Sequence, residues 1–430
     1  MKSHQTSDVI ASHQTSEVRP ERAGLALLTV SHAVDDLYQG AVPALIPFLV
    51  VAYHYDYLKV SGITLAATLI SSVAQPAFGY LADRRTSGWL WPAGMVMAAT
   101  GIAVAGIASQ YLLIWLAVAL SGLGVAAYHP ESARAVRMIG GGSAQAMSWF
   151  ALGGNLGFAV GPVAVTAMLG VTGLRGTPLL IVPALAMAAV VFAQRGRLGV
   201  LAAPGGRRGA PSAGKRDDWP RFAWLTGVVV CRSVLFFGMS SFLELYLIHR
   251  FHESHTVASA ALTVFSGAGV IATIGGGWLA DRCGRVLTIR CGYALAAPAL
   301  VGLVLAPDPV AAFAAAAICG LGAYLPFAVQ TTLAQEYLPN HLGTASGIAL
   351  GLAVSAGGLA APLLGLFADA YSLRDTLAVL VALPLCALAL STRLHETRAQ
   401  RPGAAARAEA AHRNGIHADG ARAARSRELR

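Results

Sequence analysis

Charged residues are scarce in this chain. Asp, Glu, Lys and Arg make up 12% of its 430 residues, whereas hydrophobic residues make up 56%. An ordinary soluble domain carries roughly 25% charged residues, so the composition excludes that class. Apolar segments near 20 residues long recur along the chain, and about 20 residues is the length at which a helix crosses a bilayer. We therefore predict an all-α membrane protein.

Cysteine is also rare. The five residues are Cys231, Cys283, Cys291, Cys319 and Cys386. Their number is odd and no two form a CxxC pair, which argues against a disulfide framework or a zinc site, so we expect small buried thiols. The chain also lacks HExxH, GxSxG and the phosphate loop GxxxxGK[ST]. We therefore predict no metal site, no cofactor and no enzymatic activity.

A motif near residue 80 returns later in the chain. Gly79–Arg85 reads GYLADRR, and Gly277–Arg285 reads GWLADRCGR. The Gly-Leu-Gly sequence at 122–124 likewise returns at 320–322, so both repeats have a period of 198 residues. A single repeat of this length predicts two homologous halves rather than a solenoid of short units.

Hydropathy places six membrane spans in each half. The expected spans are approximately 24–50, 60–81, 89–108, 111–129, 144–170, 177–193, 223–248, 257–280, 286–306, 309–334, 345–370 and 375–391. We expect a disordered N-terminal tail (1–22), a first six-helix bundle (23–193), a linker loop (194–222), a second six-helix bundle (223–392) and a basic disordered C-terminal tail (393–430).

Lys and Arg are distributed unevenly between the two sides of the predicted membrane. Fourteen lie in loops on the side that carries both termini, and four, Lys59, Arg175, Arg250 and Arg374, lie on the other side. Loops rich in Lys and Arg stay in the cytoplasm. We therefore predict a multi-pass protein of the bacterial inner membrane with both termini in the cytoplasm.

The repeated motif suggests a latch. Asp83 and Arg84 directly follow the second predicted span, and Asp281 and Arg282 directly follow the eighth. Glycine permits close helix approach, and an aspartate at a helix end can pair with arginine or cap a neighbouring helix. We interpret these residues as a cytoplasmic latch that stabilises one access state. The alternative is a turn that only anchors two helices.

The first span contains an unusual polar group. His32, Asp35 and Asp36 have the i, i+3, i+4 spacing that places them on one side of a helix, and Gln39 extends that side. Charged residues inside a span are costly and are therefore functional candidates. Two neighbouring carboxylates repel each other and a nearby histidine can offset this, which suits a proton carrier. A structural polar cluster is the alternative.

The fourth span is predicted to end at a proline. His129, Glu131 and Arg134 surround Pro130, which we expect to break the helix. These three residues are candidates for a cytoplasmic gate or a proton-exit relay. An ordinary cap at the membrane interface is the alternative.

Spans five and seven supply further candidates. Asn155 lies in the glycine-rich sequence GGNLGFAVGP, whose glycine spacing favours tight helix packing. Arg232 is the one cation that we place within a span, with Glu244 and Tyr246 later on the same helix. An arginine within the membrane usually pairs with an acidic side chain or binds an anionic ligand. With Gln39, these four residues are the predicted substrate-binding set.

Taken together, the motifs resemble those of a known family. GYLADRR and GWLADRCGR resemble the loop motif of the major facilitator superfamily, and HPESARAV, GGNLGFAVGP and the Arg-Ser pair at Arg232 resemble its fosmidomycin-resistance family of drug:proton antiporters. The resemblance implies two six-helix bundles with the substrate site between them. Members of the fosmidomycin-resistance family often carry an Asn-Asp pair where this chain has Asp35 and Asp36, and many drug antiporters carry an arginine where it has Val118. We therefore assign proton coupling to span one.

The sequence thus predicts a secondary transporter. We expect proton-coupled efflux of a small organic compound by alternating access, driven by the proton gradient, with Asp36 exchanging protons beside Asp35 and His32. Arg232 would meet an anionic group such as a phosphonate. The alternatives are a proton-coupled importer of an organic anion or sugar phosphate, and a non-transporting receptor or an enzyme. The expected partners are substrate, protons and lipid, without nucleic acid, for a monomeric protein.

Overall fold

The computed structural model describes residues 4–55, 57–84, 88–198 and 216–396, and the regular secondary structure in these ranges is helical. Twelve of the described helical segments are long and apolar enough to cross a membrane. This confirms the predicted all-helical membrane fold with twelve spans.

The described residues of the first half form six α-helices and one short 3₁₀ helix. They are α1 (His4–Tyr53), α2 (Tyr57–Arg84), α3 (Leu90–Ile107), α4 (Tyr111–Ile139), α5 (Ala144–Thr172), η1 (Leu174–Leu180) and α6 (Ile181–Leu198).

The second half repeats this pattern with two interrupted spans. Its helices are α7 (Trp219–Phe251), α8 (His255–Cys283), α9 (Arg285–Val304), α10 (Pro309–Tyr324), α11 (Phe327–Tyr337), α12 (Leu342–Ala370), α13 (Leu373–Leu380) and α14 (Ala382–Ser391). The pairs α10–α11 and α13–α14 each form one span.

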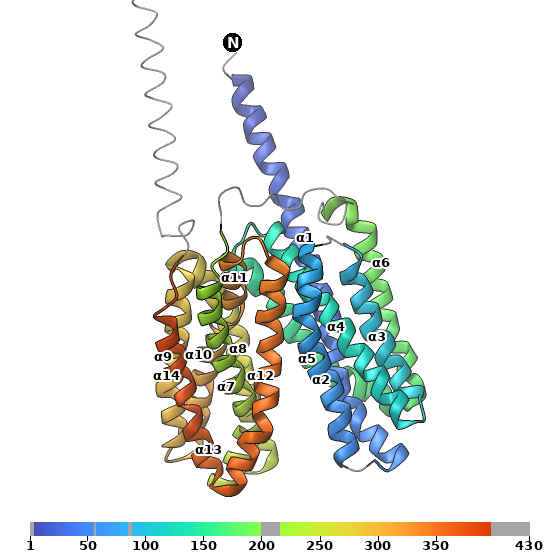
Figure 1. The fold of residues 1–430 in the computed structure, drawn as a ribbon, viewed down its shortest axis with the longest axis vertical. Helices are drawn as coiled ribbons and strands as arrows, with labels where there is room; N and C mark the ends of the chain where they lie inside the picture. The colour runs from blue at the N-terminus through green and yellow to red at the C-terminus, as the bar shows by residue number, and fades with distance from the viewer. Residues whose placement is uncertain (1–3, 56, 85–87, 199–215, 397–430) are drawn as a thin grey trace, which may run out of the picture.

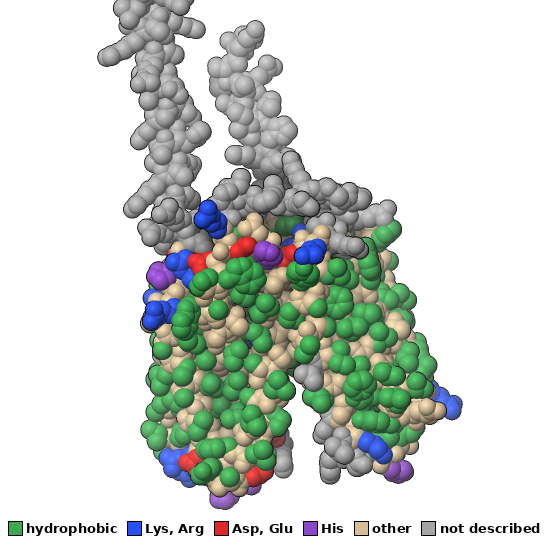
Figure 2. All heavy atoms as spheres, in the orientation of Figure 1, with side chains coloured by type: hydrophobic (Ala, Val, Ile, Leu, Met, Phe, Trp, Pro, Cys, Tyr) green, Lys and Arg blue, Asp and Glu red, His purple; other side chains and the backbone are tan. Residues whose placement is uncertain are grey.

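The two halves form separate bundles that stand side by side (Figure 1). Helix α2 packs against α12 and α5 packs against α8, and α4 and α11 add contacts to α12 and α5 across the interface. We call the end at which α6 finishes and α7 begins the linker end, and the opposite end the far end. The halves meet at the linker end and separate toward the far end, where the space-filling surface is split (Figure 2).

The molecular surface is apolar between two charged ends (Figure 2). Large side chains such as Val171 and Leu363 are 88% and 67% exposed. Such exposure would be unfavourable in water but suits a surface that faces lipid. The cysteines follow the same logic. Cys231 and Cys319 are buried, but Cys283, Cys291 and Cys386 are exposed, which corrects our expectation of five buried thiols.

Glycines bring α1 and α5 into close contact. A Cβ atom at Gly153 would collide with the backbone of Thr29, and one at Gly157 would collide with the backbone of Ala33. The two helices therefore approach until their backbones touch, as small residues permit in membrane bundles. This contact fixes α5 beside the polar residues of α1.

Two expected boundaries differ from the structure. Helix α1 begins at His4, so residues 4–22 are helical where we expected a disordered tail. Helix α4 continues through Pro130 to Ile139 instead of ending at residue 129. His129 Nδ1 donates to the carbonyl of Val125 and Ser132 Oγ donates to that of Tyr128, so side chains stabilise the backbone around the proline. Most of the expected linker and C-terminal tail, residues 199–215 and 397–430, lies outside the described residues.

Candidate functional site

Three side chains from two helices meet inside the first half. His32 and Asp36 come from α1 and His129 comes from α4; we call them the His–Asp cluster. The Nε2 atoms of His32 and His129 are 3.2 Å apart. Asp36 lies 3.3 Å from His32 Nε2 through Oδ2 and 3.4 Å from His129 Nε2 through Oδ1. All three side chains are at most 14% exposed, so the charges interact with little screening by water.

Backbone carbonyls orient both imidazole rings. His32 Nδ1 is 2.7 Å from the carbonyl oxygen of Phe150 on α5, and His129 Nδ1 is 2.9 Å from that of Val125. The ring of His32 also stacks on that of Phe150 with centroids 3.9 Å apart. These contacts turn the Nε2 atoms toward each other and toward Asp36.

Asp35 is buried beside the cluster. Its side chain is fully buried, and neither of its oxygens accepts a hydrogen bond from a described residue. The nearest cationic candidate is His129, whose Nδ1 is 3.8 Å from Asp35 Oδ2. A buried carboxylate without partners is costly, so Asp35 needs a proton or a cation nearby.

The structure thus brings His32, Asp35 and Asp36 together as predicted, and adds His129 to them. We had assigned His129 to a gate with Glu131 and Arg134. The alternative was a proton-exit relay, and both ideas assumed a helix end at Pro130, which the structure does not have. Since α4 continues, His129 points to α1, while Glu131 and Arg134 form a separate buried ion pair of 2.7 Å.

The other candidates of the first half lie close to the cluster. Gln39 is half-buried on α1, one turn beyond Asp36. Asn155 is half-buried on α5, next to Gly154, where a Cβ atom would touch His32 and Asp36. The Nδ2 atom of Asn155 has no hydrogen-bond partner among the described residues. The Asn155 amide is therefore an unpaired polar group beside the cluster.

Arg232 occupies a different environment in the second half. Its side chain is 4% exposed, and no described acidic side chain forms an ion pair with it. Its guanidinium carbon lies 4.5 Å from the ring centroid of Phe327, the first residue of α11. Its Nε has no hydrogen-bond partner in the described part of the chain. Arg232 thus places a buried positive charge beside the break between α10 and α11.

Glu244 and Tyr246 do not join Arg232. They follow it on α7 by 12 and 14 residues, which is about 18 and 21 Å along a helix axis. Tyr246 Oη donates to the carbonyl of Leu303 at 3.3 Å, which ties α7 to the end of α9. Tyr293 of α9 donates to the carbonyl of Val228, one turn before Arg232 on α7, at 3.3 Å. Gln330 donates to Tyr293 Oη at 2.7 Å.

The repeated aspartates connect the two halves at the linker end. Asp83 accepts hydrogen bonds from the backbone N–H groups of Gly343 (2.7 Å) and Thr344 (2.8 Å) at the start of α12. Asp281 accepts hydrogen bonds from those of Ala144 (2.8 Å) and Gln145 (3.0 Å) at the start of α5. Each carboxylate therefore caps a helix of the opposite half, where it also meets the positive end of the helix dipole.

The motif arginines act within their own helices. The guanidinium carbon of Arg84 lies 4.5 Å from the ring centroid of Tyr80, and that of Arg282 lies 4.3 Å from that of Trp278. These are contacts one turn apart on α2 and α8. At these two positions it is therefore the preceding aspartate, and not Arg84 or Arg282, that contacts the opposite half.

Sequence reasoning missed a further contact at the linker end. Arg285 is fully buried, forms a 2.8 Å ion pair with Glu336 of α11 and donates to the carbonyl of Gly142 at 2.6 Å. Gln335 donates to the carbonyl of Ala133 at 3.1 Å. The two hydrogen bonds to Gly142 and Ala133 cross between the halves, whereas the ion pair lies within the second half. The basic motif around Arg285 was visible in the sequence, but it did not reveal that this arginine is buried.

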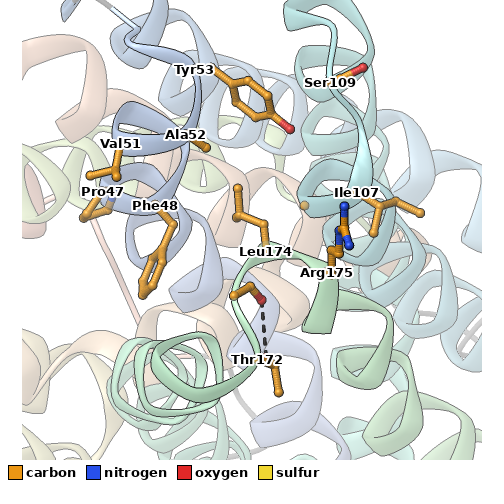
Figure 3. Close-up of a pocket in the computed structure, with 12 residues that line it drawn as sticks. Pro47, Phe48, Val51, Ala52, Tyr53, Ile107, Ser109, Thr172, Leu174 and Arg175 are labelled. Carbon is orange, nitrogen blue, oxygen red and sulfur yellow. Dashed lines mark hydrogen bonds between the residues drawn. The ribbon is translucent and has the colours of Figure 1, made fainter.

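A pocket of about 920 Å³ opens at the far end of the first half (Figure 3). Its walls are mainly apolar, and Arg175 is the charged residue among those that line it. Phe48 in its wall follows His32 on α1 by 16 residues, about 24 Å along the helix. The pocket is therefore separate from the His–Asp cluster.

The fold and these sites define a polytopic transporter with two related halves. The Major Facilitator Superfamily model matches residues 28–362 and 229–417, so the chain belongs to the major facilitator superfamily. It is a secondary transporter and not an enzyme.

Two bacterial relatives cover most of the chain. The fosmidomycin resistance protein of Escherichia coli K12 is 31% identical over 386 residues, which are 87% of this chain and 93% of the relative. The uncharacterized MFS-type transporter YfnC of Bacillus subtilis 168 is 29% identical and covers 84% of this chain and 90% of its own length.

Solved structures show the same fold at low sequence identity. The fucose:proton symporter FucP in the outward conformation has a TM-score of 0.69 at 15% identity and covers 87% of this chain and 100% of its own. The human organic anion transporter MFSD10 has a TM-score of 0.70 at 14% identity and covers 86% of this chain and 99% of its own.

Proposed function

We propose that this protein exports a small organic anion in exchange for protons, and that fosmidomycin or a similar phosphonate represents its substrate class. The proposal depends above all on the division of polar groups between the halves. The first half holds an acidic and imidazole cluster, and the second half holds a buried arginine without an acidic partner among the described residues.

The His–Asp cluster and Asp35 suit proton exchange. Each of the two carboxylates has an oxygen within 4 Å of an imidazole nitrogen, and the side chains are at most 14% exposed, so each protonation changes the charge that its neighbours experience. Proton entry can release about 2.3 kcal/mol for a membrane potential of 100 mV. That energy supports roughly a 50-fold substrate gradient.

Arg232 suits an anionic substrate. A guanidinium group binds phosphonate or carboxylate through paired, charge-assisted hydrogen bonds. Its free Nε and its position at the break between α10 and α11 favour a ligand there, because interrupted helices mark binding sites in transporters. The relative in Escherichia coli is named for resistance to fosmidomycin, a phosphonate, which agrees with this chemistry.

We further propose that the linker end faces the cytoplasm of a bacterium. The excess of Lys and Arg on that side supports this orientation. The split surface would then open away from the cytoplasm, as the name of the outward FucP structure says of that protein. The aspartate caps at the linker end would act as the latch that holds this state.

Everted membrane vesicles that contain a pH-sensitive dye test the proposal. The vesicles are energised so that protons accumulate inside, and fosmidomycin is then added outside. We expect proton release from wild type, loss of that release in Asp36→Asn and Arg232→Ala, and retention in Arg250→Ala, which removes an exposed arginine at the far end of α7.

The outcomes separate the alternatives. Proton movement in the same direction as substrate would identify an importer. No response to fosmidomycin or to other organic anions, with correctly inserted protein, would refute the proposed substrate class. Release that persists in Asp36→Asn would refute the assignment of proton exchange to the His–Asp cluster.

A further inference from the structure

The hydrogen bonds of the two histidines in the His–Asp cluster restrict which ring nitrogens can carry a hydrogen atom. A carbonyl oxygen only accepts hydrogen bonds, so His32 Nδ1 must donate to Phe150 and His129 Nδ1 must donate to Val125. In a neutral imidazole the other nitrogen then carries a lone pair. The two Nε2 atoms would therefore face each other as acceptors across 3.2 Å.

The Asp36 carboxylate places two further acceptors beside the two Nε2 atoms. Its two oxygens lie 3.3 and 3.4 Å from the two Nε2 atoms. An ionised carboxylate has no hydrogen to donate. With both rings neutral and Asp36 ionised, the cluster would thus consist of acceptors alone, which repel one another across the contact between α1 and α4.

A second proton creates the opposite difficulty. Two imidazolium rings with Nε2 atoms 3.2 Å apart would repel each other in a buried site. The titratable groups around the pair are Asp35 and Asp36 on α1 and Tyr128 on α4, while α5 contributes the carbonyl of Phe150. Asp36 is the one carboxylate within 3.5 Å of the two Nε2 atoms among the described residues, so one positive charge balances it.

We infer that His32 and His129 share a single proton between their Nε2 atoms, and that this pair is the proton-carrying group of the transporter. The observed distance of 3.2 Å is that of an ordinary N–H···N hydrogen bond. Asp36 then acts as the counter-ion of the shared proton. His129 therefore becomes a proton-binding residue on a different helix from the rest of the site.

The inference deepens the proposed function and depends on it for the role of the proton in transport. Loss of the shared proton would leave two facing lone pairs and remove a bond between α1 and α4. The contact between these helices would then depend on whether the site holds its proton. Sharing also means that the histidine pair holds one proton at most.

Nitrogen-15 solid-state NMR tests the pairing directly. Full-length protein with ¹⁵N-labelled histidine is reconstituted in lipid at neutral pH, without substrate. We expect a through-hydrogen-bond coupling between two Nε2 nuclei of different residues. Two separately protonated Nε2 atoms, or two unprotonated ones, would overturn the inference, and this wild-type measurement does not depend on any variant folding.

Matched substitutions assign the signal. His129→Asn and His32→Asn each retain an amide near the Nδ1 position and delete Nε2. Either should remove the coupling, whereas His249→Asn, at an exposed position on α7, should leave it intact. A coupling that persists in either cluster variant would refute the assignment. If the coupling is present but no organic anion moves protons in vesicles, the proposed transport function is refuted, while the sharing of a proton between His32 and His129 is confirmed.

Discussion

Asp281 of the second half caps the first turn of α5 in the first half, with its Oδ1 atom 2.8 Å from the backbone nitrogen of Ala144. Gly277, one turn earlier on α8, allows this approach, because a Cβ atom there would lie 2.8 Å from the carbonyl oxygen of Ala144. The glycine and the aspartate of the repeated motif therefore act on the same contact.

Removing the charge of the caps should open the linker end. Hydrogen bonds to a charged group contribute about 1.5–3 kcal/mol each, so Asp83→Asn or Asp281→Asn should raise the population open at the linker end by roughly 10-fold or more. Distances between spin labels placed on either side of that end measure the change. Asp308→Asn is the matched control, because Asp308 caps α10 within the second half. An unchanged distance distribution in both motif variants would contradict the latch.

Loss of Arg285 should destabilise the protein strongly. Breaking a buried ion pair by removing one partner costs about 3–5 kcal/mol, and Arg285 is fully buried against Glu336. We expect Arg285→Gln to lower the thermal stability in detergent markedly, with Arg282→Gln nearly neutral because Arg282 is exposed. Equal melting temperatures for the two variants would show that the ion pair contributes little.

The contact between α1 and α5 should not tolerate a larger side chain. Gly157→Val would push the new side chain into the backbone of Ala33, and overpacking of this kind costs typically about 1–3 kcal/mol. Gly170→Val on the same helix is the control, since a Cβ atom there meets no other atom within 4 Å. Thermal unfolding and retention in the bilayer measure both. Similar losses in both variants would indicate a general effect of valine on α5.

Substitution of Arg232 should affect anion binding more than stability. Arg232→Gln removes the charge, and a hydrogen bond to a charged group is worth about 1.5–3 kcal/mol, so fosmidomycin affinity should fall roughly 10- to 100-fold. Calorimetry with purified protein in lipid nanodiscs measures the binding, and Arg232→Lys should retain part of it. Affinity that survives in Arg232→Gln would exclude this residue from the substrate site.

Local patterns predicted the fold well because the bilayer restricts the solutions. Two helical bundles could be predicted from the twelve apolar segments, the repeat near Asp83 and Asp281 and the glycines of α5. Capping by the aspartates was one of two expectations for them, and it is the one that the structure shows. A span in lipid must be a helix, so its length and hydropathy are sufficient evidence for it.

Contacts between distant helices were beyond such patterns. The meeting of His129 with His32 depends on how deep α4 lies and on its continuation past Pro130, which tertiary packing decides. Glu244 and Tyr246 seemed to belong with Arg232 because they share a span, but helical rise separates them. The burial of Arg285 likewise follows from the junction of two halves, which one sequence does not reveal.

The capping contacts at the linker end are reciprocal. Asp83 of the first half holds α12 of the second, and Asp281 of the second half holds α5 of the first. Each half thus carries both a carboxylate and the helix terminus that receives one. A surface of this kind is self-complementary, as in a twofold symmetric dimer. Two identical half-length chains would form the same pair of contacts, which fits an origin of this protein by duplication of a gene for a dimeric ancestor.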